Sequence, residues 1–201
     1  MVLSPKQRKP LLVALSGPSG AGKSTFAILL ARQLRRQKCR VKICRIADPL
    51  YAAQRVIYRL AGREANPVKF QDTLLLSFLG AHFRRINKNS LLKTFALKMQ
   101  KSKNQLMGAE ASAIICADAR TPDLPQLRRL GFTMVYVGAP RRTISQRIKK
   151  RGDANPIHAD PKLEIIKSRW VWDHSIENAG SLDDLSLRAA ELASRLAAQV
   201  S

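Results

Sequence analysis

The chain has 201 residues, 45% of them hydrophobic, and a formal net charge of +22 at neutral pH. This length suits one well-buried core, so residues 1–201 are expected to form a single domain, and no apolar run approaches the roughly 18 residues that span a bilayer. The three cysteines lack CxxC spacing, which argues against a disulfide framework and favours a reducing cytoplasm.

The positive charge is concentrated in the first three quarters of the chain. Residues 1–150 contain 30 of the 36 basic residues and six of the 14 acidic ones, whereas residues 151–201 have a net charge of −2. A nucleotide site accounts for only part of this excess. The remainder either attracts nucleic acid non-specifically or forms a solvated surface, because no aromatic interleaving marks a base-stacking platform.

Residues 11–15, Leu-Leu-Val-Ala-Leu, form a short apolar run typical of a buried strand. They lead into residues 17–25, GPSGAGKST, which match the P-loop pattern G-x-x-x-x-G-K-[ST]. From Phe26 onward apolar residues recur at helical spacing, which predicts an amphipathic helix. A strand, a glycine-rich turn and a helix in this order predict a site for a nucleoside triphosphate.

The residue types of this loop suit phosphate binding. Its glycines let successive backbone amides point inward at phosphate oxygens, and the helix that begins near Lys23 adds the positive end of its dipole. Lys23 is predicted to reach the β- and γ-phosphates, and the Ser24 hydroxyl to hold Mg²⁺. The residues predicted to bind ATP are Gly17, Ser19, Gly20, Ala21, Gly22, Lys23, Ser24 and Thr25.

A second strand is predicted over residues 41–46, and Asp48 follows it directly. A carboxylate just beyond the carboxyl end of a strand lies where open α/β sheets bind their ligands. Because Pro49 suits the first helical position, Asp48 also suits a helix N-cap. Both roles are compatible, and Asp48 is predicted to face the substrate.

Residues 50–105 show helical spacing and no convincing strand. One helix is predicted to close near Gly62, and two more to follow, broken around Gly80 and at the polar turn 87–89. His82 is expected to be structural. The sequence therefore predicts a helical substrate-binding insertion over about residues 49–108.

A third strand is predicted over residues 113–118, apolar and ending in Asp118. This is the Walker B pattern, in which Asp118 would hold Mg²⁺ directly or through water. Since Asp118 stands shortly before Pro122, it also suits the start of a turn. Arg120 follows two residues later and can point into the same crevice.

The remaining segments complete a regular alternation: a helix over residues 122–130, a strand over 132–137, a helix over 141–151, a short strand over 173–178 and a final helix capped by Ser181. Arg147 and Arg151 are i,i+4 neighbours beside the loop 152–158. They predict a short phosphoryl-transfer lid over about residues 147–160. A solvent-facing basic helix end is the alternative.

The order of these segments resembles the P-loop nucleotide kinases, and within them the deoxynucleoside monophosphate kinases of large DNA phages and related bacterial proteins. Besides the P-loop, the similarity rests on short motifs in the same order. They are residues 47–50 (ADPL), residues 79–80 (LG) with 84–87 (RRIN), residues 118–120 (DAR) followed by 130–131 (LG), and residues 176–178 (IEN) with 180–182 (GSL). The last pair is also similar to the closing segment of dephospho-coenzyme A kinase.

The resemblance implies a three-layer α/β P-loop NTPase fold, with a five-stranded parallel sheet in the order 2-3-1-4-5 and helices on both faces. The core would comprise residues 11–48 and 112–201. The resemblance also implies ATP as donor, with Mg²⁺, and a (deoxy)nucleoside monophosphate as acceptor. Two features depart from the family: Leu91 or Leu92 replaces an expected aromatic residue, and the family is not this basic.

Transfer to a monophosphate needs no strong general base, because the acceptor is already ionised near neutral pH. Charge neutralisation and alignment carry such a reaction. The residues predicted to be catalytic are Lys23, Asp48, Arg120, Arg147 and Arg151. Those predicted to bind the acceptor are Asp48, Arg84, Arg85 and Arg120.

Two other functions stay open on the sequence alone. The same fold could phosphorylate a coenzyme A precursor, another small metabolite or a polynucleotide 5′ end, and a hydroxyl acceptor would require a base, for which Asp48 is the best candidate. The chain could instead be a nucleic-acid-stimulated ATPase. Its helical insertion and Arg-x-x-x-Arg segment favour a kinase over this last function.

Overall fold

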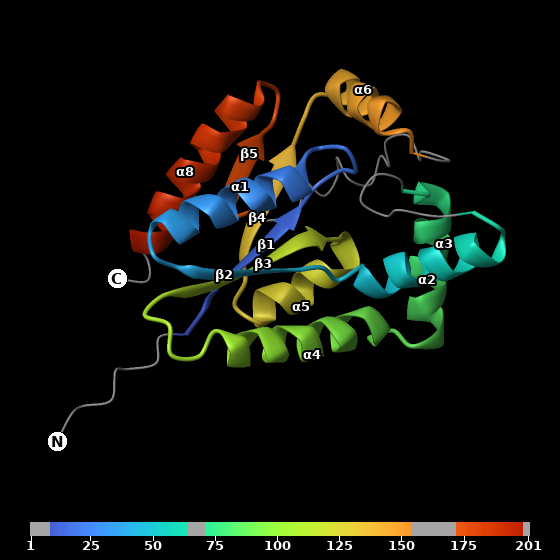
Figure 1. Ribbon diagram of the computed structural model, residues 1–201, viewed down its shortest axis with the longest axis horizontal. Coiled ribbons are helices and arrows are strands. Elements are labelled where there is room, and N and C mark those ends of the chain that lie inside the picture. The colour runs from blue at the N-terminus through green and yellow to red at the C-terminus, as the bar shows by residue number, and fades with distance from the viewer. Residues whose placement is uncertain (1–8, 64–70, 154–171, 199–201) are drawn as a thin grey trace.

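The computed structural model describes residues 9–63, 71–153 and 172–198, and Figure 1 shows their arrangement. In chain order the elements are β1 (Leu11–Ser16), α1 (Lys23–Arg36), β2 (Arg40–Cys44), α2 (Asp48–Leu60), α3 (Thr73–Ile86), α4 (Ser90–Gln105), β3 (Ser112–Ala119), the 3₁₀ turn η1 (Thr121–Asp123), α5 (Leu124–Arg129), β4 (Thr133–Gly138), α6 (Arg141–Arg151), β5 (His174–Glu177) and α8 (Leu182–Ala198). Among the described helices, none combines the length and apolar character needed to cross a membrane.

All five strands run parallel in one sheet, in the order β2-β3-β1-β4-β5, which confirms the predicted topology. β1 lies in the middle, with Val13 opposite Ile115 of β3 and opposite Thr133 of β4. A central parallel strand is covered on both faces, which is why residues 11–15 are apolar without alternation. The carboxyl ends of the strands therefore meet at one edge of the sheet, where the P-loop begins.

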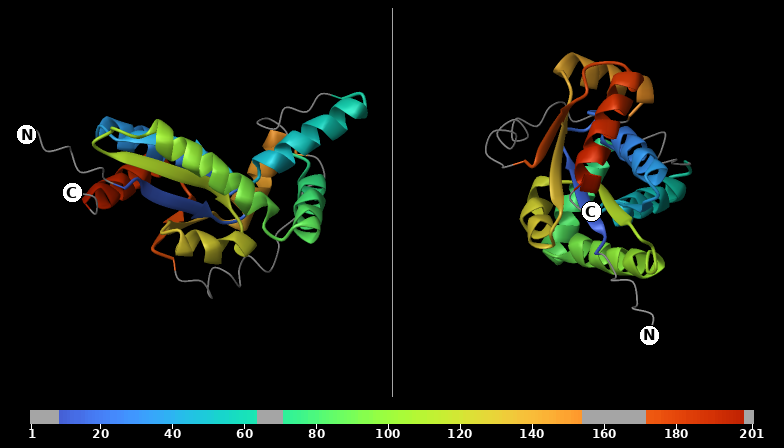
Figure 2. Two further views of the ribbon diagram at one scale, coloured as in Figure 1. Left: turned by 90° about the horizontal axis from the view of Figure 1, so that it is seen from below. Right: turned by 90° about the vertical axis from the view of Figure 1, so that its left-hand side faces the viewer.

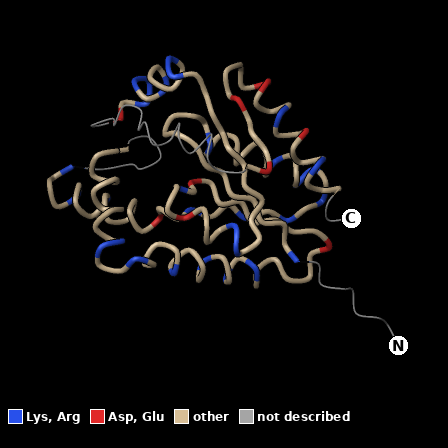
Figure 3. The backbone as a smooth tube through the Cα atoms, turned by 180° about the vertical axis from the view of Figure 1, so that it is seen from behind, with Lys and Arg blue, Asp and Glu red and all other residues tan. Residues whose placement is uncertain are grey.

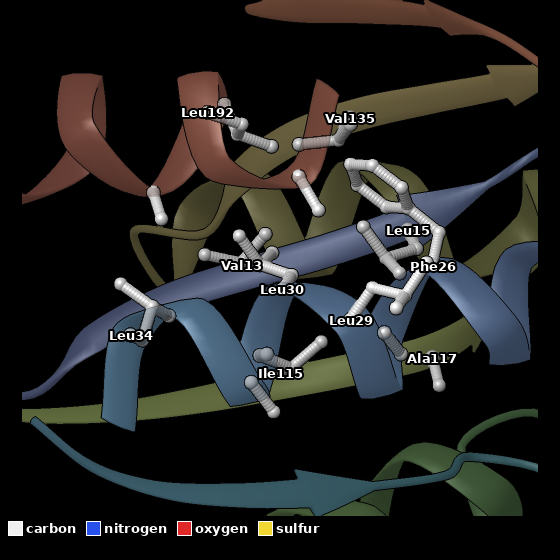
Figure 4. Packing of buried hydrophobic residues seen from close by; sticks show 14 of the residues in the cluster. Val13, Leu15, Phe26, Leu29, Leu30, Leu34, Ile115, Ala117, Val135 and Leu192 are labelled. Atoms are coloured by element: carbon white, nitrogen blue, oxygen red, sulfur yellow. The ribbon is translucent and has the colours of Figure 1, made fainter. Parts of the chain in front are cut away.

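Helices cover both faces of the sheet and bury two hydrophobic clusters. On one face, Val13 and Leu15 of β1 pack with Phe26 and Leu30 of α1 and with residues of α8 (Figure 4). On the other face, Ala14 of the same strand packs in a cluster formed with α4 and α5. Successive strand residues point to opposite faces, so one short strand supplies both clusters. The result is a three-layer α/β architecture.

The segment between β2 and β3 is helical throughout its described part, but its boundaries differ from the prediction at one point. Gly80 lies inside α3 instead of breaking it, and the helix ends at the polar turn that begins with Asn87. A Cβ at Gly80 would lie 3.4 Å from Leu50 of α2. α3 therefore continues through Gly80 where it contacts α2, and the low helix propensity of glycine does not end it.

The three helices of this segment lie in two places. α4 runs along one face of the sheet and buries Leu91, Phe95 and Met99 in the core cluster, whereas α2 and α3 extend past the carboxyl edge (Figures 1 and 2). The projecting part of the insertion is thus α2 and α3. It stands beside the loop that connects β1 to α1.

Candidate nucleotide-binding and phosphoryl-transfer site

The P-loop leaves β1 through two glycine positions that only glycine can occupy. Gly17 has φ 137°, and a Cβ there would lie 2.1 Å from the carbonyl oxygen of Val137. Gly22 has φ 95° and precedes Lys23, the first residue of α1. The first turn of α1, all of it described, has no acidic residue, and Gly22 places no side-chain acceptor on its amides. These amides can therefore receive an anion.

Lys23 is buried and folds back over its own loop. Its Nζ donates hydrogen bonds to the carbonyl oxygens of Gly17, at 2.9 Å, and of Pro18, at 2.7 Å. Burial holds the pKa of Lys23 well below 10.5; the charge of Arg120 and, less strongly, that of Arg151 lower it further, and Asp118 opposes them. The ammonium is thus poorly compensated by protein groups. A triphosphate would supply the missing negative charge.

Asp118 lies at an irregularity at the end of β3. Ala14 pairs with Cys116 and Ser16 with Ala119, so β3 carries one extra residue where Asp118 stands. Such bulges redirect a side chain and are frequent beside active sites. The sequence pattern indicated a strand ending in an acid, but the extra residue depends on how β3 pairs with β1.

The carboxylate of Asp118 binds the loop that follows β2. It accepts hydrogen bonds from the amides of Ile46, at 2.8 Å, and Ala47, at 3.0 Å. Burial raises the pKa of Asp118 above 3.8, and these two bonds partly offset the rise. Oδ1 also accepts from the Cys116 thiol, at 3.9 Å, so Oδ2 is the less occupied oxygen for Mg²⁺ or a water bound to it. Within the described ranges no group of three or more metal-ligating side chains gathers.

The charges of two of the predicted catalytic arginines act on Lys23. The charges of Arg120, which follows β3, and of Arg151, at the end of α6, both lower the pKa of Lys23. Arg151 is ion-paired with Asp153, and its Nε lies 2.5 Å from Asp153 Oδ1. The predicted lid continues to residue 160, but residues 154–160 lie outside the described ranges. Two arginines from different parts of the chain thus both disfavour the charged form of the P-loop lysine.

Arg147, the other predicted lid arginine, reaches the P-loop through a residue that the sequence analysis assigned no role. Its Nη2 donates to Oδ1 of Asn178, at 3.2 Å, and its Nη1 to the Asn178 carbonyl oxygen, at 3.4 Å. The side-chain Nδ2 of Asn178 in turn donates to the carbonyl oxygen of Ala21, at 2.8 Å. Asn178 is buried just after β5, and a Cβ on Gly22 would lie 2.3 Å from its Nδ2. It thereby couples α6 to the phosphate loop.

The residues predicted to bind the acceptor are dispersed. Asp48 begins α2 and forms an ion pair with Lys98 of α4. Arg84 donates to the buried Asp123 at 3.1 Å and to the Gly80 carbonyl oxygen at 3.2 Å, which ties α3 to η1. Arg85 is exposed on α3. The structure thus gives Arg84 a structural contact and leaves acceptor binding by Arg85 and Arg120 as predictions.

Two residues of α2 carried no functional signal in the sequence. Tyr51, in the first turn of α2, has its pKa raised by burial, then by Asp118, while the charges of Arg120 and Arg45 oppose the rise. Gln54, one turn further on, is fully buried, and its amide has no hydrogen-bond partner. Tyr51 and Gln54 are three residues apart, so they lie on neighbouring faces of one helix. From hydrophobic periodicity alone, Tyr51 would be assigned to the core.

A scan against protein-family models finds no match to this chain, and a search of curated proteins finds none either. Among solved structures, the protein TT1252 from Thermus thermophilus matches with a TM-score of 0.51 and 18% identity, over 94% of this chain and 99% of that one. The Mycobacterium tuberculosis APS kinase CysC, solved with AMPPNP and APS, matches with a TM-score of 0.50 and 15% identity, over 92% of this chain and 98% of that one. At such identities the likeness concerns the fold, and the chain has the α/β fold of the P-loop kinases.

Proposed function

We propose that this chain transfers the γ-phosphoryl group of ATP to a (deoxy)nucleoside monophosphate, giving the diphosphate. The observation that supports this most directly is the buried P-loop lysine Lys23, which folds back over its own loop and whose pKa is lowered by burial and by the charges of Arg120 and Arg151. Cations from three elements at a P-loop suit the equatorial charge of a phosphoryl group in transfer. The APS kinase structure of similar fold was solved in complex with AMPPNP and APS, so a chain of this fold can bind a nucleotide together with a second ligand.

The proposed step moves one group between two phosphates. An ionised oxygen of the acceptor phosphate bonds to the γ-phosphorus, and the bond from that phosphorus to the bridging β,γ-oxygen breaks, so ADP leaves with the electron pair. Lys23 would hold the β- and γ-phosphates, while Arg120 and Arg151 would stabilise the transferring group. Ser24, exposed in the first turn of α1, and Asp118 would hold Mg²⁺, which neutralises phosphate charge when bound.

The surroundings of Asp48 favour a phosphate acceptor over a hydroxyl acceptor. A hydroxyl must lose its proton during transfer, and Asp48 is the best candidate for a base. Its Oδ2 atom is engaged in an ion pair with Lys98, which occupies the position that a hydroxyl acceptor would approach. His82, the other residue of interest in the insertion, is exposed and stacks on Phe78 with ring centroids 5.6 Å apart. A phosphate acceptor requires neither group as a base.

The buried Gln54 supports a nucleotide acceptor in particular. A side-chain amide offers a donor and an acceptor side by side, which is the pattern that reads the edge of a base. A buried amide without partners costs free energy of about 1–3 kcal/mol in the free protein, and a bound ligand can recover it. We propose that Gln54 contacts the acceptor once α2 and α3 adjust around it.

The deciding experiment is an acceptor panel with γ-phosphate-labelled ATP and Mg²⁺. Each ribo- and deoxyribonucleoside monophosphate is tested beside dephospho-coenzyme A, APS and an oligonucleotide with a 5′ hydroxyl. Saturable labelling of at least one monophosphate, lost in Lys23→Ala, is the expected result. Label that appears only on the oligonucleotide or in free phosphate would contradict the proposal and favour a polynucleotide kinase or an ATPase.

A further inference from the structure

A basic groove lies at the amino-terminal end of β2, at the edge of the sheet remote from the P-loop. It has a volume of about 470 Å³. Its lining comes from the end of α1, from β2 and from the end of α4, and consists of Arg35, Lys38, Cys39, Arg40, Val41, Lys42, Gln105 and Leu106. Four of these eight residues are cationic and none is acidic. The groove therefore concentrates positive charge in a concave surface.

Helix electrostatics explains only part of this concentration. Arg35 and Lys38 lie at the negative end of the α1 dipole, which stabilises cations there. Arg40 and Lys42 belong to β2, have exposed side chains and share one face of the strand, since they are two residues apart. No helix dipole favours a charge at those positions, and like charges two residues apart repel one another.

Lys38 adds an independent observation. It is the only non-glycine residue with positive φ in the described ranges, at 62°. It follows α1 at the position where a helix ordinarily ends in glycine or asparagine, because a Cβ is unfavourable there. A lysine therefore occupies a strained position on the rim of a basic groove. Strain of this kind accumulates where a side chain has a function.

The groove is separate from the proposed catalytic site. α1 begins at the P-loop and ends at the groove, and its 14 residues span about 20 Å at the usual rise per residue. Cations continue along α4, which contacts β2 through Cys44 Sγ and Ser102 Oγ, 3.5 Å apart, and Figure 3 shows lysines along that helix. Basic residues thus occur on α1, on the edge strand β2 and on α4.

We propose that this groove binds the phosphate backbone of a nucleic-acid duplex without reading its sequence. A backbone is a ridge of regularly spaced anions, which suits cations arranged around a hollow, whereas the plane of a bilayer cannot enter one. Single strands are usually held by stacking on aromatic rings, and no aromatic residue lines the groove. The proposal is independent of the proposed kinase activity, since it involves different residues.

The first test measures duplex binding by fluorescence anisotropy in the absence of ATP, across a series of salt concentrations. The double variant Arg40→Gln/Lys42→Gln is compared with Arg129→Gln/Arg188→Gln, which removes the same charge from exposed residues of α5 and α8. The groove variant should bind roughly tenfold or more weakly, and its slope of log affinity against log salt should fall by about two. Equal losses in both variants would show diffuse charge and overturn the site.

The second test uses a variant that is expected to fold well. Lys38→Gly removes one charge and relieves the left-handed strain, so its Tm should equal or exceed that of the parent while duplex affinity falls several-fold. Unchanged affinity in a folded Lys38→Gly protein would contradict the proposal. Phosphoryl transfer should remain at the parent rate, which separates this result from a failure of the proposed activity.

Protection of a thiol in the groove from chemical modification can show directly where the ligand binds. Cys39 lines the groove and is partly exposed, whereas Cys44 and Cys116 are buried, so a maleimide should modify Cys39 first. Duplex DNA or RNA should slow this modification several-fold, as read by mass spectrometry, and inorganic phosphate at equal ionic strength should not. Protection by phosphatidylserine vesicles instead of duplex would replace the proposed ligand with a membrane surface.

Discussion

At the scale of single residues, Lys23 combines burial with a charge that the free protein compensates poorly. Lys23→Ala should lower phosphoryl transfer by about two to three orders of magnitude, because one positioned cation contributes a few kcal/mol to the transition state. The measurement is kcat/KM for ATP with the best acceptor. Lys42→Ala, at the other end of the sheet, is the matched control and should retain the parent rate.

The burial of Lys23 should also make the free energy of unfolding depend on pH. The pKa of Lys23 is lower in the folded protein than the usual 10.5, so the unfolded chain binds more protons in that interval. Unfolding free energy should therefore rise as pH increases from the folded-state pKa toward 10.5, relative to Lys23→Met, which has no such group. If the difference in unfolding free energy between the parent and Lys23→Met did not change with pH in urea titrations, Lys23 would be fully charged when folded.

Asn178 provides a second prediction, for a residue that positions others. Asn178→Ala removes bonds to Ala21 and Arg147, and we expect about 1–3 kcal/mol of destabilisation and roughly a tenfold loss of kcat/KM for ATP. Asn178→Asp keeps an acceptor for Arg147 but places a carboxylate against the Ala21 carbonyl oxygen. If Asn178→Asp were equal to the parent in ATP dependence, the bond to the P-loop would be irrelevant to nucleotide binding.

Gln54 should show opposite effects on stability and function. Gln54→Met fills similar space without an unpartnered buried amide, so the free protein should be stabilised by about 1 kcal/mol or more. The KM for the acceptor should rise at least tenfold while the KM for ATP stays constant. Thermal melts and steady-state kinetics check this, and a variant with unchanged acceptor KM would remove Gln54 from the acceptor site.

At the scale of elements, two glycines that look alike in the sequence should respond differently to alanine. Gly80→Ala adds a methyl group 3.4 Å from Leu50 inside α3, an ordinary contact, so helix propensity should stabilise the protein by about 0.5–1 kcal/mol. Gly17→Ala would place its Cβ 2.1 Å from the Val137 carbonyl oxygen and should disrupt the P-loop or the fold. Urea unfolding of both variants tests the pair, and similar stabilities would contradict the structure.

The elements also differ in how well the local sequence pattern predicts them. The strands and most helix ends follow from apolar runs, glycines and Ser181, whose Oγ accepts from the amide of Asp184 at 3.1 Å. The local pattern does not predict that α4 packs on the sheet while α2 and α3 project from it. α4 has the same periodicity as α3, yet it packs on the sheet through Phe95 and Met99. Periodicity identifies an apolar face but does not specify its partner.

At the scale of the whole molecule, the net charge of +22 should make stability depend on salt. Raising sodium chloride from about 20 to 200 mM shortens the Debye length from above 20 Å to below 10 Å and screens repulsion among the cations. The Tm should therefore rise, and sodium sulfate should raise it further. Arg40→Gln/Lys42→Gln should show a smaller rise, whereas a Tm that falls with salt would mean that attractive ion pairs dominate.

The parallel sheet and its strand order were implied by the resemblance to the P-loop nucleotide kinases, whereas the residues by themselves determined the phosphate loop and the alternation of strands and helices. These depend on local chemistry: glycines that permit positive φ, apolar runs that bury strands, and a lysine at a fixed position after the loop. Lys23 accordingly begins α1, and the bounds of β1, β3 and β4 each lie within one residue of the predicted ones.

Only the tertiary structure decided which distant side chains meet at that loop. Asn178 reaches Ala21 from 157 residues away, Asp118 binds the amide of Ile46 across 72 residues, and Arg84 donates to Asp123 across 39 residues. Such contacts depend on an extra residue in one strand, on the crossing of two helices and on the turn after β5. The residue spacing within a single segment does not predict these contacts, because they form only when the layers pack together.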